Sequence, residues 1–471
     1  MGGNYKMKNK PKNRMLVCLV LATLLTSFLF LPTTLGQYNE KAIEQPRTIG
    51  FPEQNEIQKL IASDGTPHDY FGTSVAVDGD FMIIGAPLNE ENGYDAGAVY
   101  IYEYDGETWN EVQQILGQEF AQLGGAVDIE GNVAVIGAIG DDWLRGGVYI
   151  YRYDGSTWNQ EQLLTDDIVN NAFGNAVSLV GDKLLIGAED DNTNGQFAGA
   201  AYIYHYIGTT WVEKQKLIGS DTESSDGFGR SVAVDDDVLI IGADYNDGAV
   251  NRSGSAYIYR YNGASWTEEQ KLIASNGEQG DYFGSAVAIE NNEVVIGAPQ
   301  TSNGGKGIVY IFKDQGETWE EIQIIETESS FAYFGYALAR RGNSMIIGAC
   351  KDEGHGTAYL YRTSDQEWIE EEKYVASDAA YDDKFGSSVA IDDNVVLIGA
   401  PDENNQNGEE AGSAYVFEMP KLGDIDGDGD VDTADLLALL AAWGNPGGPE
   451  DLNSDGIVNT ADLLILLGNW G

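Results

Sequence analysis

Cysteine is almost absent from this 471-residue sequence, which holds only Cys18 and Cys350. Cys18 lies in an N-terminal apolar segment that we expect to be removed, so Cys350 would be the single cysteine of the mature chain. Disulfide bonds therefore cannot hold the fold together. Its stability has to come from a large buried core.

Histidine and basic residues are also scarce, with three histidines and 26 lysines and arginines against 76 aspartates and glutamates. Nucleic acid is excluded as a partner, because proteins bind its phosphates with clustered Lys and Arg. Binding to an anionic membrane by charge alone is excluded for the same reason. His68, His205 and His355 form no metal-binding pair and no Ser-His-Asp order, so we expect a non-catalytic protein. The many carboxylates leave an enzyme of glycoside hydrolase or lyase type as the alternative.

The N-terminus has the three parts of a secretory signal peptide. Five basic residues precede an apolar run at residues 15–31, and small residues follow around Gly36. We expect cleavage after residue 36, a short linker at residues 37–52, and no membrane insertion of the mature chain. An uncleaved anchor is the alternative, although 17 apolar residues are at the short limit for spanning a bilayer.

The middle of the chain repeats with a period of about 50 residues, which is typical of propellers and solenoids. Each of three landmarks occurs seven times. The first is Phe-Gly before a short strand, with Leu-Gly in the second copy. The second is a strand ending in Ile-Gly-Ala or a close variant, and the third is Tyr-Ile-Tyr or a close variant. Their positions are Phe71, Leu123, Phe173, Phe228, Phe283, Phe334 and Phe385; Gly85, Gly137, Gly187, Gly242, Gly297, Gly348 and Gly399; Tyr100, Tyr149, Tyr202, Tyr257, Tyr310, Tyr359 and Tyr415.

A fourth element begins with a tryptophan after copies one to six and is missing after copy seven. All four segments are short, rich in β-branched and aromatic residues, and bounded by turn residues, so they read as strands. Four strands in seven copies predict an all-β, seven-bladed β-propeller over residues 53–420. Residues 57–61 have the fourth-strand pattern with no copy before them. We expect them to pair beside residues 415–417 and close the ring.

These landmarks resemble the FG-GAP repeats of integrin α-chain propellers over roughly residues 57–417. Every copy has the Phe-Gly, Gly-Ala and Tyr positions, and a binding site would not be sevenfold, so we expect these positions to be framework. Integrin-type blades often hold a calcium loop between their first two strands. Here that link is too short, as in residues 77–81, so calcium in the blades is not expected.

Function should lie where the copies differ. The links into the first strands, and those between the second and third strands, should share one face of the ring, and they vary in length and content. They are acidic, with scattered aromatic residues such as Tyr94, Phe197, Tyr245 and Tyr381. This composition would suit a glycan, a basic peptide or a ligand bridged by calcium, and a merely solvated rim is the alternative.

Two acidic loops of twelve residues lie 27 residues apart in a C-terminal domain at residues 421–471. Ca²⁺ prefers six to eight oxygen ligands, which such a loop supplies from positions 1, 3, 5, 7, 9 and 12. We therefore expect two Ca²⁺ ions. The ligands would be the side chains of Asp424, Asp426, Asp428, Asp432 and Asp435 with the Asp430 carbonyl, and the side chains of Asp451, Asn453, Asp455, Asn459 and Asp462 with the Ile457 carbonyl.

Each loop runs into a leucine-rich helix, and no helix of ordinary EF-hand pattern precedes it. This doublet resembles a type I dockerin, a small α-helical module of two EF-hand-like units that docks secreted proteins onto cohesin domains. The resemblance implies that Thr433, Ala434, Thr460 and Ala461 contact a cohesin-like partner. Residues 440–441 and 467–468 lack the basic pair of many dockerins, so another surface protein, or a role as a sorting tag, is the alternative.

Three functions remain open from the sequence. The first is a secreted or cell-surface, non-catalytic binding or adhesion propeller attached through its calcium-binding tail. The second is a carbohydrate-active component that binds or cleaves polysaccharide, since dockerin-bearing proteins resemble parts of polysaccharide-degrading assemblies and paired carboxylates suit glycan cleavage. The third is a structural surface or matrix protein.

Overall fold

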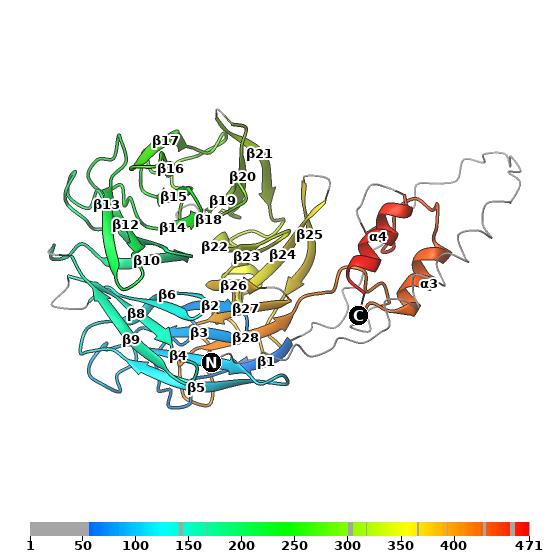
Figure 1. Ribbon diagram of the computed structural model, residues 1–471, viewed down its shortest axis with the longest axis horizontal. Coiled ribbons are helices and arrows are strands. Elements are labelled where there is room, and N and C mark those ends of the chain that lie inside the picture. The colour runs from blue at the N-terminus through cyan, green and yellow to red at the C-terminus, as the bar shows by residue number, and fades with distance from the viewer. Residues whose placement is uncertain are drawn as a thin grey trace, which may run out of the picture. The chain divides into compact units, whose positions relative to one another are not determined.

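The computed structural model describes residues 56–470 apart from 141–144, 167, 300–304, 317, 365–366, 393, 427–429 and 453–456. The predicted signal peptide and linker lie outside the described residues. In the described chain, 28 strands form seven antiparallel four-stranded sheets arranged around a ring (Figure 1). The predicted seven-bladed propeller is confirmed.

The blades follow one another along the chain, and each runs from an inner to an outer strand. Blades 1 to 3 comprise β2 (Ser74–Asp78), β3 (Phe81–Ala86), β4 (Ala98–Tyr104) and β5 (Trp109–Leu116); β6 (Leu123–Glu130), β7 (Val133–Ala138), β8 (Gly147–Tyr153) and β9 (Trp158–Leu164); β10 (Phe173–Val180), β11 (Lys183–Ala188), β12 (Ala200–Tyr206) and β13 (Trp211–Leu217).

Blades 4 to 6 have the same order of strands, and a short 3₁₀ helix, η1 (Asp352–Gly354), lies within blade 6. The strands are β14 (Val232–Asp235), β15 (Val238–Ala243), β16 (Ser255–Tyr261) and β17 (Trp266–Leu272); β18 (Ala286–Glu290), β19 (Glu293–Ala298), β20 (Ile308–Asp314) and β21 (Trp319–Glu326); β22 (Phe334–Arg341), β23 (Ser344–Ala349), β24 (Thr357–Ser364) and β25 (Glu367–Tyr374).

Blade 7 joins the two ends of the propeller. Its first three strands are β26 (Ser388–Asp392), β27 (Val395–Ala400) and β28 (Ser413–Glu418), and its outer strand is β1 (Glu56–Leu60). Lys59 is paired with Tyr415 in the antiparallel register of β1 and β28. The inner strand β26 also contacts β2 of blade 1, so the ring is closed.

Two of the repeated glycines meet where neighbouring blades touch. A Cβ atom on Gly85, at the end of β3, would lie 2.0 Å from the carbonyl oxygen of Gly124, at the start of blade 2. The same pairing recurs around the ring and ends with Gly399 against Gly72. The Gly-Ala landmark is therefore required by the close approach of two backbones.

The repeated aromatic residues fill the space within and between the blades. Phe71 is fully buried, and its ring lies edge-on to Tyr100 at a centroid distance of 5.3 Å. Equivalent pairs occur in blades 3 to 7. The expectation that these landmarks are framework is confirmed.

One face of the ring, which we call the loop face, is formed by the links into the inner strands and those between second and third strands. Backbone hydrogen bonds join the two kinds of link at seams between neighbouring blades. The N–H groups of Phe120 and Gln122, which lead into blade 2, donate to the carbonyls of Tyr94 and Asp95 of blade 1 at 2.8 and 2.9 Å. The loop face is thus held on a rigid scaffold, as binding loops require.

The C-terminal residues form a small helical unit with α3 (Thr433–Ala441) and α4 (Thr460–Gly468). Its core is formed by Val431, Leu439, Val458 and Leu466, each of which is fully buried. Neither helix is long and apolar enough to cross a membrane, and no other α-helix is present in the described residues.

Candidate functional sites

In four blades a lysine side chain forms ion pairs with carboxylates of the links on the loop face. In blade 3, Lys216 Nζ lies 2.7 Å from Asp191 Oδ2 and 5.1 Å from the centroid of the Tyr202 ring. Burial alone would raise the pKa of Asp191, but the Lys216 ammonium and the Thr193 donors lower it. Equivalent lysines are Lys59, Lys271 and Lys373. These charges are paired, and they stabilise the links.

In blade 1 the same position is held by Gln114. Its Nε2 donates to Asp64 Oδ2 at 2.7 Å and to Glu91 Oε2 at 2.9 Å, and Tyr100 donates to Asp64 Oδ1 at 2.7 Å. Two carboxylates therefore meet at an uncharged amide where blades 3, 4, 6 and 7 place an ammonium group. The proximity of Asp64 raises the pKa of Glu91.

A second charged group lies where blades 3 and 4 meet on the loop face. Arg230 Nη1 lies 3.1 Å from Glu189 Oε1, and Arg230 Nε lies 3.8 Å from Asp244 Oδ2. Asp244 is buried, and burial raises its pKa to about 6 despite the nearby arginine. Ser285 Oγ donates to Asp244 Oδ2 at 3.3 Å. The positive charge of Arg230 is therefore largely neutralised by the carboxylates of Glu189 and Asp244.

The loop face is hollowed over blades 1 to 3. One hollow of about 310 Å³ is lined by Tyr70, Thr73, Pro87, Leu88, Gln122, Gly125 and Ile139. A second of about 360 Å³ is lined by Asp95, Phe120, Gln122, Ile139, Gly140, Asn170, Ala172 and Asp190. Gln122 and Ile139 line both, so the two hollows adjoin. We call them together the blade 1–3 hollow.

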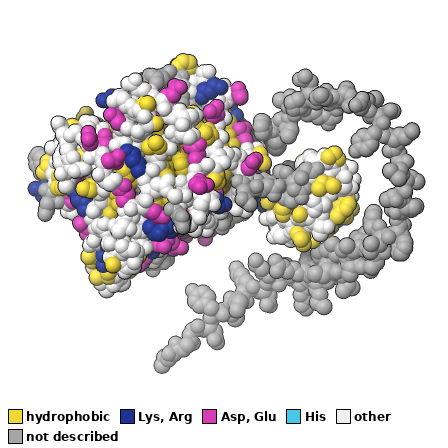
Figure 2. All heavy atoms as spheres, turned by 90° about the horizontal axis from the view of Figure 1, so that it is seen from above, with side chains coloured by type: hydrophobic (Ala, Val, Ile, Leu, Met, Phe, Trp, Pro, Cys, Tyr) yellow, Lys and Arg dark blue, Asp and Glu magenta, His cyan; other side chains and the backbone are white. Residues whose placement is uncertain are grey.

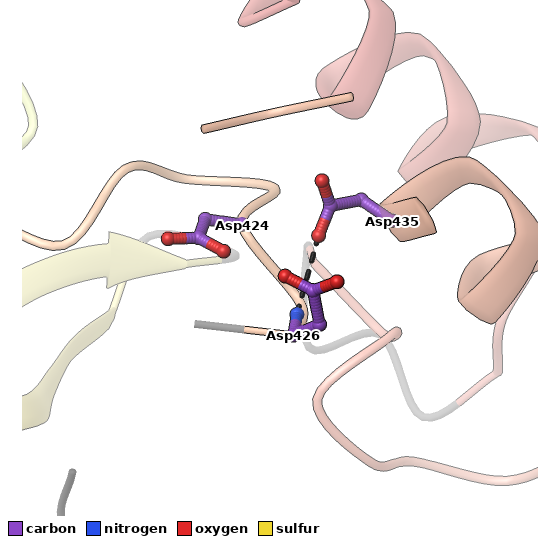
Figure 3. Close-up of side chains that lie close together, drawn as sticks. All are labelled: Asp424, Asp426 and Asp435. Carbon is purple, nitrogen blue, oxygen red and sulfur yellow. Dashed lines mark hydrogen bonds between the residues drawn. The ribbon is translucent and has the colours of Figure 1, made fainter. Parts of the chain in front are cut away.

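Three predicted calcium ligands come together in the first C-terminal loop (Figure 3). Carboxylate oxygens of Asp424, Asp426 and Asp435 all lie within 4.8 Å of one another. With Ca–O distances of 2.3–2.6 Å, one ion could contact all three, so the residues fit calcium. Asp428 and the turn glycine Gly429 lie outside the described residues.

Asp435 is held in place by backbone donors. Its Oδ1 accepts from the N–H groups of Ile425 and Asp426 at 2.7 and 3.2 Å, and its Oδ2 accepts from Asp432 N–H at 2.7 Å. Burial alone would raise the pKa of Asp435, but these donors lower it. The carboxylate is therefore ionised, as a calcium ligand has to be.

The second loop repeats the same capping arrangement at its helix. Asp462 is fully buried and accepts from Asn459 N–H at 2.7 Å, and Asn459 Oδ1 accepts from Ala461 N–H at 2.8 Å. Asn459 Nδ2 donates to the Ile457 carbonyl at 2.8 Å. Asp451 is buried. Asn453 and Asp455 lie outside the described residues.

The predicted partner-contact residues lie at the first turns of the two helices. Thr433, Ala434 and Thr460 are exposed, and Ala461 is half-buried. Hydrophobic side chains also gather on the surface of this unit (Figure 2). The large exposed ones include Leu437, Leu440, Trp443 and Leu464, with exposed fractions of 62%, 40%, 44% and 66%.

Sequence reasoning identified the acidic loops and the variable face, but it did not find the blade 1–3 hollow. The aromatic residues that the sequence placed on the variable links are all exposed, namely Tyr94, Phe197, Tyr245 and Tyr381. Phe120, Gln122 and Asp190 were not singled out. A comparison of the residues three before each Phe-Gly pair would have shown Phe120 as unusual, because most copies have a small or polar residue there.

The fold defines a seven-bladed propeller made of one repeated unit, and the sequence comparison identifies that unit. Five segments match the FG-GAP repeat, at residues 55–102, 158–204, 211–259, 266–312 and 368–417, which together make up just over half of the chain. The chain belongs to the FG-GAP repeat family. Residues 103–157 and 313–367, which include most of blades 2 and 6, fall outside these segments.

Among curated proteins, the chain is similar to integrin alpha-PS3 of Drosophila melanogaster, with 33% identity over 135 residues. The match covers 25% of this chain and 12% of the integrin, so the chain matches only a small part of its relative. Among solved structures it is similar to a chain in the crystal structure of the mitotic checkpoint complex. The TM-score is 0.51 at 12% identity, with 83% of this chain and 99% of that chain covered. At this identity the likeness concerns the fold alone.

Proposed function

We propose that this protein is an extracellular or cell-surface binding protein. The loop face of its propeller recognises a ligand, and its C-terminal unit, folded around two Ca²⁺ ions, attaches it to a partner protein. The observation that carries the first part is a closed, rigid ring with variable, partly apolar links on one face. Membership of the FG-GAP repeat family and the similarity to an integrin α chain support an adhesion role outside the cell.

The calcium proposal rests on the first C-terminal loop and on its repeat. In the first loop, Asp424, Asp426 and Asp435 offer three converging carboxylates, with Asp428, Asp432 and the Asp430 carbonyl as the remaining ligands. Bound Ca²⁺ would neutralise the repulsion among these groups and fix the loop ahead of α3. Asp451, Asn453, Asp455, Ile457, Asn459 and Asp462 would do the same ahead of α4.

The attachment surface would be the exposed side of the two helices. Leu437 and Leu464 occupy equivalent positions in α3 and α4 and are the two most exposed leucines of the unit. Exposed apolar side chains of this kind mark surfaces that a partner covers. With Thr433, Ala434, Thr460 and Ala461 they would form two similar contact surfaces for a cohesin-like or other surface protein.

The test is capture of partners from the secreted and envelope fractions of the source organism, with calcium and with chelator. The unmodified chain is compared with an Asp435→Asn, Asp462→Asn double variant. Asp430→Asn is the control, because position 7 contributes its carbonyl. We expect one partner to be captured only with calcium, by the unmodified and control chains. Equal capture by all chains in chelator would refute calcium-dependent attachment.

A further inference from the structure

One left-handed backbone position recurs at the loop face in every blade. The third residue before each inner-strand Phe-Gly or Leu-Gly pair has a positive φ, between 56° and 81°. These residues are His68, Phe120, Asn170, Ser225, Gly280, Phe331 and Asp382. Glycine and asparagine adopt this conformation readily, whereas a bulky residue there is strained.

Phe120 is costly at this position for two reasons. Its φ is 68°, and 53% of its side chain is exposed to solvent. The same loop geometry is met by Asn170 in blade 3 and by Gly280 in blade 5, so the fold does not require a phenylalanine. Local strain and an exposed apolar ring make Phe120 a candidate for binding. Phe331 in blade 6 shares both features, so the surroundings of Phe120 have to distinguish it.

Phe120 lies at the wall of the blade 1–3 hollow. Its ring packs against Tyr94 at a centroid distance of 5.7 Å, and Tyr94 is itself 58% exposed. Pro87, Leu88, Ile139 and Ala172 add further apolar surface. The hollow is therefore mainly apolar, with an exposed aromatic pair beside it.

Four of the polar side chains that line this hollow make few interactions within the protein. Among the described residues, the side chains of Asp95, Gln122, Asn170 and Asp190 make no hydrogen bond or ion pair. Neighbouring loop-face carboxylates behave differently. Asp191, which follows Asp190, binds Lys216, and Asp69 accepts from Thr66 and Asn89. Burial raises the pKa of Asp190, while the charge of Arg230 has a smaller, opposite effect on it. The hydrogen-bonding atoms of the four side chains are thus available to a ligand.

The charge of the lining narrows the class of ligand. Among the residues that the structure describes, no lysine, arginine or histidine lines either hollow, whereas two carboxylates do. A polyanion would meet repulsion here and on a chain with a formal charge of −50. Carboxylates accept hydrogen bonds, and side-chain amides both donate and accept them. Carboxylates and amides around an apolar surface suit a ligand that has many hydroxyl groups and also apolar C–H surfaces.

We propose that the blade 1–3 hollow binds an uncharged polysaccharide chain. Phe120 and Tyr94 would contact C–H faces of the sugar rings, while Gln122, Asn170, Asp95 and Asp190 would hydrogen bond to hydroxyls. The two adjoining hollows would accept successive sugar units. Blade 2, at the centre of the hollow, lies mostly outside the segments that match the FG-GAP repeat. This inference rests on the proposed function, because it names the ligand of the loop face.

The test measures binding of the full chain to immobilised polysaccharides in the presence of calcium. The uncharged probes are β-glucan, xylan and mannan, the anionic probes are alginate and polygalacturonate, and the cationic probe is polylysine. The variants are Phe120→Asn, which installs the residue of the equivalent position in blade 3, and Asp190→Asn. Phe331→Asn is the matched control, because Phe331 has the same exposed, left-handed position in blade 6.

We expect binding to at least one uncharged polysaccharide. Phe120→Asn should weaken it roughly tenfold or more, Asp190→Asn should weaken it less, and Phe331→Asn should leave it within about twofold. Binding only to anionic probes or only to polylysine would overturn the proposal. Equal losses for Phe120→Asn and Phe331→Asn would also overturn it.

The outcome for this inference is separable from that for the proposed function. A chain that captures a loop-face partner from the secreted fraction but binds no uncharged polysaccharide would refute the ligand class and leave the binding role intact. A chain that binds no polysaccharide and captures no secreted or envelope component, with calcium or without it, would refute both.

Discussion

The side chain of Gln323 pairs with both backbone polar groups of Trp368 across the seam between blades 5 and 6. Its Nε2 donates to the Trp368 carbonyl at 2.7 Å, and its Oε1 accepts from the Trp368 N–H at 2.7 Å. The same pair recurs at five other seams, through Gln58, Gln113, Gln162, Gln215 and Gln270. A glutamine fits because it both donates and accepts.

At the seam between blades 6 and 7, Glu372 occupies the position of this glutamine. Glu372 is buried, its Oε2 makes no hydrogen bond in the described part of the chain, and burial raises its pKa. Glu372→Gln should therefore raise the free energy of unfolding at pH 7 by about 1–2 kcal/mol. Urea unfolding measures this. The reverse change, Gln323→Glu, is the control and should destabilise, and a Glu372→Gln chain that is less stable than the original would contradict the argument.

The lysines of the loop face give a second prediction. Lys216→Gln would leave Asp191, which is fully buried, without its cation, whereas Gln114→Lys would supply one to Asp64 and Glu91. We expect Lys216→Gln to destabilise by about 1–3 kcal/mol, and Gln114→Lys to stabilise by at most about 1 kcal/mol because that site is more exposed. Thermal unfolding of both variants at low and high salt tests this. Two changes of the same sign would refute it.

The fold could be predicted because each landmark occurs seven times. The contact that makes the Gly-Ala glycines necessary could not be predicted. The sequence predicts only that the Gly-Ala positions are framework, whereas the structure shows that Gly85 is constrained by the carbonyl of Gly124 in the next blade. A backbone approach between two copies is not visible within one copy. The blade 1–3 hollow was missed for a similar reason, because its lining residues on different blades become neighbours only when blades 1 to 3 pack side by side. They include Asp95, Phe120, Gln122, Ile139, Asn170 and Asp190.

The approach of the glycines predicts a steric effect that depends on position. A Cβ atom on Gly137 would lie 2.1 Å from the Gly174 carbonyl oxygen, whereas one on Gly125 of the same blade would meet nothing nearer than 3.7 Å. Gly137→Ala should therefore destabilise by roughly 1–3 kcal/mol, and Gly125→Ala should be nearly neutral. Similar denaturation midpoints for the two variants would show that the blades can move apart at no cost.

Removal of calcium should act on the C-terminal unit and spare the propeller. Without the ion, the six carboxylates of the first loop, from Asp424 to Asp435, repel one another. Excess chelator should lower the helical circular dichroism signal and leave the sheet signal unchanged. Calorimetric titration should then count two Ca²⁺ ions per chain, and one ion for Asp462→Asn if each loop binds independently. Identical helix content with calcium and with chelator would refute the calcium proposal.

The inner strand of blade 2 carries an acidic residue that should make stability depend on pH. Asp128 Oδ2 accepts from Leu179 N–H on β10 at 2.7 Å, and Oδ1 accepts from Ile129 N–H at 2.8 Å. Burial raises the pKa of Asp128 to about 7 despite these donors. An unfolded aspartate titrates near pH ~3.9, so between these values the folded state keeps a proton that the unfolded state has released.

The free energy of unfolding should therefore fall as pH rises through this window and become level above about pH 7, by a few kcal/mol at most. Urea unfolding at pH 5 and pH 8 measures the difference. Asp128→Asn removes the titrating group and should reduce the difference. Glu130→Gln on the same strand removes only a smaller cause of the raised pKa, a neighbouring charge, and should keep most of the difference. If the Asp128→Asn chain shows the full pH dependence, the proton is bound elsewhere, and the contact between Asp128 and β10 has no part in the response.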